Sequence, residues 1–91
     1  MIVISVDESD FSEQLTVRPN PGGGHFWLDL GETVLDGRVE VYEAQGKRVW
    51  GERIGGVREV ALDLTHLSDG VYFVRVRAGD RFGTTRLLVR R

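Results

Sequence analysis

The stretch SDGVYFVRVRAGDRFGTTRLLVR, residues 68–90, alternates apolar and polar side chains on either side of a Gly79-Asp80 pair. Alternation at period two is typical of a strand with one buried face, and a glycine-bearing pair between two such runs is typical of a hairpin turn. With a two-residue turn, one face of this hairpin carries the side chains of Tyr72, Val74, Val76, Thr85, Leu87 and Val89. We expect this face to be core. The opposite face combines arginine with Phe73, Phe82 and Leu88, and we expect it to be either solvated or a docking surface.

The same alternation continues along the rest of the chain. It predicts strands at residues 2–6, 14–18, 25–30, 37–43, 47–53, 57–64, 71–78 and 82–90. The strands follow one another roughly every ten residues with turn signals between them, and no segment has three turns of helical periodicity. The sequence therefore predicts one all-β domain, an antiparallel β-sandwich.

Gly70 and Tyr72 indicate which kind of sandwich to expect. A tyrosine two residues after a glycine, at the entry to a strand, is the pattern of the tyrosine corner in immunoglobulin-like sandwiches. In that corner the hydroxyl donates a hydrogen bond to backbone a few residues upstream. We expect Tyr72 to have this structural role.

The chain's two prolines both lie in the stretch VRPNPGGG, residues 17–24. Pro19 and Pro21 hold the residues before them in extended geometry and provide no backbone donor, so the preceding strand must end here. The three glycines then allow the chain to turn into the next apolar run. A simple turn needs less than this, so the corner is either geometrically demanding or recognised by a partner.

Composition argues against most chemical functions. Twelve basic and fourteen acidic residues give a net charge of −2 and a pI near 5.6, which is unlike a nucleic-acid-binding domain. The absence of cysteine excludes disulfides and thiolate metal sites, and His25 and His66 have no partner at metal-ligand spacing. No serine lies in a nucleophile motif, and no apolar run reaches ten residues. We expect no catalytic site, metal, cofactor, nucleic-acid partner or membrane insertion.

Four segments together resemble a known family: LTVRPNP at 15–21, VEVYEAQGKRV at 39–49, LDLTHLSDGVYFVRV at 62–76 and TTRLLVR at 84–90. In this order they resemble the C-terminal sorting domain of type IX secretion cargo proteins from Bacteroidetes-type bacteria. The resemblance implies an immunoglobulin-like sandwich of about seven strands, spanning residues 14–91, at the end of an exported precursor. Residues 1–13 would then be a linker or the tail of an upstream cargo domain.

The resemblance also implies partners and recognition residues. The partners would be the outer-membrane type IX translocon and a surface sortase that cuts within about residues 5–13, so the protein would pass the periplasm and reach the cell surface or medium. Gly46 falls on the family's central turn. The recognition residues carried over from the family's motifs are Pro19, Asn20, Pro21, Gly24, Gly70, Tyr72, Thr85, Arg86, Leu87, Leu88, Val89 and Arg90.

A second interpretation belongs to a different class of function. An immunoglobulin-like module at the end of a surface enzyme could be adhesive or bind carbohydrate, with Trp27, Trp50 and Tyr42 as a stacking platform for sugars. Tryptophans in sandwiches are more often part of the core. We therefore expect a sorting signal rather than a sugar-binding module.

Overall fold

The computed structural model describes residues 11–91, and the strand expected at residues 2–6 lies outside this range. Within it the chain forms a short 3₁₀ helix and seven strands. They are η1 (Ser12–Gln14), β1 (Thr16–Arg18), β2 (His25–Val34), β3 (Gly37–Glu43), β4 (Arg48–Ile54), β5 (Val57–Asp63), β6 (Gly70–Ala78) and β7 (Arg81–Val89). The described part contains no α-helix, which confirms the all-β prediction.

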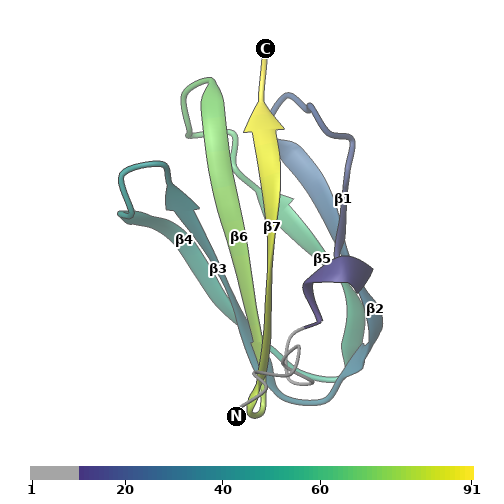
Figure 1. The fold of residues 1–91 in the computed structure, drawn as a ribbon. Coiled ribbons are helices and arrows are strands. Elements are labelled where there is room, and N and C mark those ends of the chain that lie inside the picture. The colour runs from purple at the N-terminus through teal and green to yellow at the C-terminus, as the bar shows by residue number, and fades with distance from the viewer. Residues whose placement is uncertain (1–10) are drawn as a thin grey trace, which may run out of the picture.

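The strands form two antiparallel sheets that face each other as an open sandwich (Figure 1). One sheet has the order β1-β2-β5 and the other the order β4-β3-β6-β7. The chain crosses between the sheets after β2, after β4 and after β5. This arrangement confirms the immunoglobulin-like antiparallel β-sandwich of seven strands.

The β6–β7 hairpin has the predicted register. Ala78 pairs with Arg81 across the Gly79-Asp80 turn, and the pairing continues to Gly70 and Val89. Gly79 has a φ of +65°, a left-handed conformation that glycine adopts without steric cost. Because alternate residues point to opposite faces, this register places Tyr72 beside Leu87 on the inner face and Phe73 beside Arg86 on the outer face.

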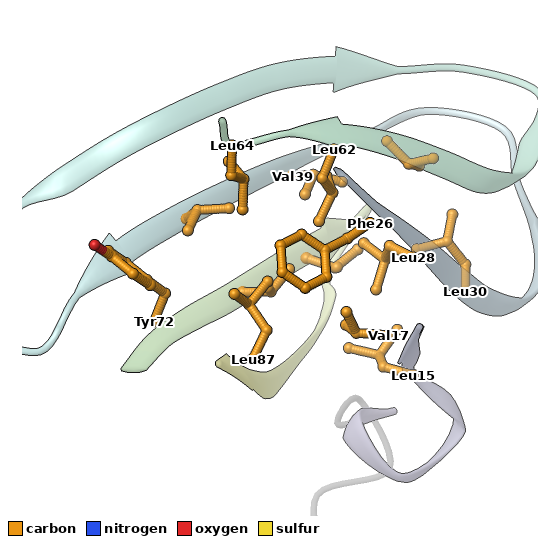
Figure 2. Close-up of a cluster of buried hydrophobic side chains, with 14 of the residues drawn as sticks. Leu15, Val17, Phe26, Leu28, Leu30, Val39, Leu62, Leu64, Tyr72 and Leu87 are labelled. Atoms are coloured by element: carbon orange, nitrogen blue, oxygen red, sulfur yellow. The ribbon is translucent and has the colours of Figure 1, made fainter. Parts of the chain in front are cut away.

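The core lies between the two sheets. Within residues 11–91, no polar or charged residue is buried. Phe26 and Leu28 enter it from β2, while Val39 and Leu87 enter from the opposite sheet (Figure 2). Leu28 and Val39 are completely inaccessible to solvent. Each fully buried side chain of this size contributes about 1.5–3 kcal/mol, so the two-sided burial holds the sheets together.

Two predicted strand boundaries differ from the structure by more than one residue. The first strand begins at Thr16, because Gln14 closes the 3₁₀ turn and its side-chain amide binds Leu30 O and Glu32 Oε1, both at 2.9 Å. The second strand runs to Val34, beyond the predicted end at residue 30, through an irregularity at Gly31. Gly31 has a φ of +78°, which allows the strand to bend and continue.

Candidate recognition site

Strand β7 lies at the edge of the four-stranded sheet, with β6 as its only neighbour in that sheet. The alternate residues of an edge strand point their N–H and C=O groups away from the sheet, where they attract other chains. On β7 these are residues 82, 84, 86 and 88. In this chain the residues between Phe11 and Gly22 satisfy most of them, so the edge is covered from within.

Asn20 covers the middle of this edge with its side chain. Its amide nitrogen donates to Arg86 O at 3.0 Å, and its amide oxygen accepts from Leu88 N–H at 3.0 Å. The side-chain amide thus makes the pair of hydrogen bonds that a neighbouring strand would make. Asparagine suits this position because no other side chain of its length offers both a donor and an acceptor in one plane.

Gly22 continues the covering with its backbone. Its N–H donates to Leu88 O at 3.0 Å and its carbonyl accepts from Arg90 N–H at 2.8 Å, forming a parallel bridge with Val89 between them. A Cβ atom here would lie 2.6 Å from a ring carbon of Phe26 and 2.8 Å from Pro19 O. Only glycine allows this close approach, so the glycines of the corner serve packing as well as turning.

The corner itself is compact and exposed on its outer side. Both proline peptide bonds, Arg18–Pro19 and Asn20–Pro21, are cis. Pro19, Asn20 and Pro21 are exposed, whereas Gly22 and Gly24 are buried. Gly24 accepts a hydrogen bond from Leu64 N–H at 2.7 Å, which ties the corner to the start of the β5–β6 loop.

The other half of the β7 edge is covered by the residues before β1. Phe11 N–H donates to Phe82 O at 3.1 Å, and the Ser12 hydroxyl accepts from Thr84 N–H at 2.8 Å. The Phe11 ring is buried, and the guanidinium carbon of Arg81 lies 4.8 Å from its centroid. The sequence did not indicate the roles of Phe11 and Ser12, because neither residue lies in a strand pattern or in a family motif.

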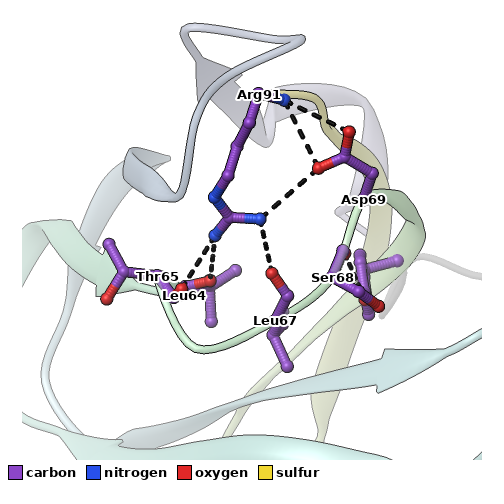
Figure 3. Close-up of polar contacts among 7 residues, drawn as sticks. Leu64, Thr65, Leu67, Ser68, Asp69 and Arg91 are labelled. Carbon is purple, nitrogen blue, oxygen red and sulfur yellow. Dashed lines mark hydrogen bonds and ion pairs between the residues drawn. The ribbon is translucent and has the colours of Figure 1, made fainter.

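Arg91 fastens the end of this strand to the β5–β6 loop (Figure 3). Its guanidinium donates to Leu67 O at 2.5 Å and to Thr65 O at 2.8 Å, and it lies 3.4 Å from the Asp69 carboxylate. These carbonyl groups lie in a turn, where no neighbouring strand provides their hydrogen-bond donors. Arg91 is a third residue that the sequence did not identify, since a single arginine gives no indication of what it will bind.

Tyr72 forms the predicted tyrosine corner. Its ring is buried, and its hydroxyl donates to Ser68 O at 2.7 Å, four residues upstream. The bond holds the β5–β6 loop against the start of β6, on the same loop that Arg91 contacts. The structural role expected from the sequence is confirmed.

Replacing Tyr72 with phenylalanine is expected to lower the free energy of unfolding by about 1–2 kcal/mol, because it leaves Ser68 O without its donor in a partly buried site. Chemical denaturation at constant pH measures this loss. Tyr42→Phe is the control, since the Tyr42 hydroxyl lies on the outer face and binds the Glu40 carboxylate. Equal stability losses in the two variants would contradict a special role for the corner.

The structure brings six of the twelve predicted recognition residues together around one pocket. One shallow surface pocket is lined by Asn20, Pro21, Val71, Thr85, Arg86, Leu87 and Leu88. Arg86 and Arg90 are exposed and form no ion pair within residues 11–91, whereas Leu87 and Val89 are in the core. Gly46 lies apart from this set, at the β3–β4 turn, with a φ of +95°.

The aromatic platform of the carbohydrate-binding interpretation does not form. Trp27 lies on β2, in the three-stranded sheet, while Tyr42 lies on β3 in the other sheet. Trp50 is partly buried and packs against the core. The three side chains therefore share no surface on which a sugar ring could stack. The face on which a side chain lies is set by its sheet and its register, which composition does not reveal.

No three His, Asp or Glu side chains within residues 11–91 are grouped so that they could hold a metal ion. Over the same range, no helix is both long and apolar enough to cross a membrane. The pocket beside Asn20 has Arg86 as the one titratable residue of its lining, and no residue there could act as a general base for the Thr85 hydroxyl. The site is therefore a shallow basic surface, beside a strand edge that Asn20 and Gly22 cover.

Comparison with known proteins agrees with this geometry. Residues 16–90 match the family model described as the secretion system C-terminal sorting domain. No curated protein matched the chain. The matched range runs from the start of β1 to the residue after β7, so it includes the corner, the tyrosine motif and the terminal strand. The chain belongs to the family of C-terminal sorting domains, which mark exported proteins for type IX secretion.

Proposed function

We propose that the secretion machinery reads a composite signal, made by the Pro19–Gly24 corner and the outer side of β7 together. The observation that carries this proposal is the pair of hydrogen bonds from the Asn20 side chain to the β7 backbone. Asn20 and Arg86 are 66 residues apart in sequence, and these bonds fix one relative to the other. A partner that docks here would contact both family motifs at once.

The recognition residues divide into two groups by burial. Tyr72, Leu87 and Val89 are buried and hold β7 and its loop in place. Asn20, Arg86 and Arg90 are exposed, and only exposed side chains are available to a partner. We therefore propose that the exposed group contacts the secretion machinery. The buried group holds the exposed side chains in position.

The partners in this proposal are the outer-membrane type IX translocon and a surface sortase. The chain would follow an upstream cargo domain, cross the periplasm and be delivered at the cell surface, where the sortase would release the cargo. Burial of the Phe11 ring and the Phe11–Phe82 hydrogen bond favour cleavage before Phe11. A protease needs several extended, accessible residues, and Phe11 and the η1 turn after it are part of the fold.

Replacing Asn20 with alanine tests the composite signal. The variant loses two neutral hydrogen bonds, so we expect about 1–2 kcal/mol less stability and a much larger relative loss of export. Asn20→Asp keeps the acceptor for Leu88 but places a carboxylate oxygen against Arg86 O, and we expect the same export defect. The readout is the fraction of a fused reporter found outside the cell.

Gln14→Ala is the matched control. The Gln14 side chain also makes two hydrogen bonds, at 2.9 Å each, but to β2 rather than to β7. We expect a similar stability loss and normal export. Normal export of Asn20→Ala would show that the corner is not read, and an equal defect in Gln14→Ala would show that export follows stability alone.

A further inference from the structure

The outer face of the four-stranded sheet carries a row of like charges. Arg53 on β4 pairs directly with Arg38 on β3, and Arg38 pairs directly with Arg77 on β6. Arg75 lies two residues before Arg77 on the same face. We call Arg38, Arg53, Arg75 and Arg77 the arginine face. Like charges directly opposite each other in a sheet are destabilising, so this row lowers the stability of the fold. Packing of the core does not require it.

Two carboxylates lie near the four arginines and offset only part of their charge, and one of them, Glu40, is directly opposite Arg75 in the β3–β6 register. Glu40 accepts from the Tyr42 hydroxyl at 2.8 Å and from Arg38 and Arg48 at 3.1 Å each. These hydrogen bonds, with Tyr42 first and then the two arginines, lower the pKa of Glu40 and keep it ionised. Asp36 lies 3.7 Å from Arg53 at a highly exposed position. Within residues 11–91, Arg75 and Arg77 form no ion pair.

Two adjoining depressions give this face its shape. One is lined by Arg38, Glu40, Arg75 and Arg77. The other is lined by Tyr42, Gly46, Phe73, Arg75, Phe82 and Thr84. Arg75 belongs to both, so a basic hollow lies directly beside an aromatic one. Phe73 and Phe82 are exposed, at 38% each, and they line the second hollow.

We propose that the arginine face docks an extended, acidic segment of a partner protein, with carboxylates in the basic hollow and apolar side chains in the aromatic one. Alternate side chains of an extended peptide are spaced about 6.8 Å apart, the same spacing that separates Arg75 from Arg77 along β6. Guanidinium groups bind carboxylates in a two-pronged geometry, which favours arginine over lysine. Phe73 and Phe82 line a hollow that can receive inserted side chains, whereas an interfacial helix binds a lipid surface with an apolar face that enters the bilayer.

The four arginines lie outside the composite signal, since none of them is on β7 or in the corner, whereas the aromatic hollow adjoins that signal through Phe82 and Thr84 of β7. The arginine contacts of the proposal therefore do not depend on how the translocon reads the chain, and a variant at Arg75 and Arg77 tests them separately. It requires an anionic partner that complements the four arginines.

Fluorescence anisotropy with labelled synthetic peptides tests the proposal on the full chain. The probe peptide has glutamates at alternate positions followed by phenylalanines at alternate positions, with serines between them. A second peptide has the same composition with the glutamates adjacent to one another. We expect the alternating peptide to bind more tightly, and its affinity to fall as ionic strength rises. No binding, or equal binding of the two peptides, would overturn the proposal.

The double variant Arg75→Gln with Arg77→Gln is expected to weaken binding of the alternating peptide about tenfold or more, because two charge-assisted contacts are lost. Its thermal midpoint should change little, because the repulsion between Arg77 and Arg38 is removed together with the attraction between Arg75 and Glu40. The matched control is Arg18→Gln with Arg58→Gln, which removes the same charge from the other sheet and should leave binding unchanged. An equal loss in the control would show that net charge alone attracts the peptide.

Two further probes separate the polypeptide from other anions. Vesicles of phosphatidylglycerol and a single-stranded oligodeoxynucleotide are each titrated against the wild-type chain and the Arg75/Arg77 variant. Arginine-dependent binding of either probe, tighter than that of the alternating peptide, would overturn the assignment to an acidic polypeptide. Weaker binding of both probes would support it.

Discussion

Replacing Leu87 with alanine is expected to lower the free energy of unfolding by about 2–5 kcal/mol. Leu87 is 1% exposed, pairs with Tyr72 across the β6–β7 hairpin and points into the core (Figure 2). Removing its side chain leaves a cavity among residues from both sheets. A domain of this size has a total stability of only about 5–15 kcal/mol, so the change removes a large part of it.

Leu88→Ala is the matched control for this prediction. Leu88 is the next residue on β7, faces the outer side and is only partly buried, so its truncation should cost about 1 kcal/mol or less. Denaturation by urea, with the slope compared between variants, measures both losses. Similar losses at the two positions would contradict the assignment of Leu87 to the core.

Reversing the charge of Arg86 and Arg90 together is expected to abolish export while leaving the fold intact. Both side chains are exposed and form no ion pair within residues 11–91, so Arg86→Glu with Arg90→Glu should change stability by less than about 0.5 kcal/mol. A docking partner that is complementary to these arginines would be repelled by two carboxylates. The folded fusion protein should accumulate in the periplasm.

The double variant Arg86→Lys with Arg90→Lys keeps the charge and should be exported. Cell fractionation of a reporter fusion, together with a thermal melt of each purified variant, separates docking from misfolding. Surface delivery of the folded charge-reversed variant at the wild-type level would exclude these arginines as part of the signal. The corner and the β7 backbone would then have to carry it.

Those parts of the fold that depend on local chemistry were predictable from the sequence. Alternation at period two places Val74 and Val76 on one face, and the Gly79-Asp80 pair sets the hairpin register. The glycine and tyrosine at 70 and 72 predicted a hydrogen bond to upstream backbone, and the hydroxyl of Tyr72 binds Ser68 O. Each of these inferences uses residues close in sequence.

The features that were missed join distant residues or depend on register. Nothing in the PNP stretch indicates that the Asn20 side chain would bind backbone 66 residues away. The row of Arg53, Arg38 and Arg77 comes from three different strands and exists only once their pairing is known. The Trp27 and Tyr42 platform failed for the same reason, since the two residues lie in different sheets.

The most direct test of the sorting assignment is export of a reporter that carries a signal peptide at its start and residues 1–91 at its end. The fusion is expressed in a bacterium with type IX secretion and in an isogenic strain whose translocon is deleted. We expect the reporter outside the first strain and in the periplasm of the second. Delivery outside both strains, or retention inside both, would contradict the conclusion that this chain is a type IX sorting signal.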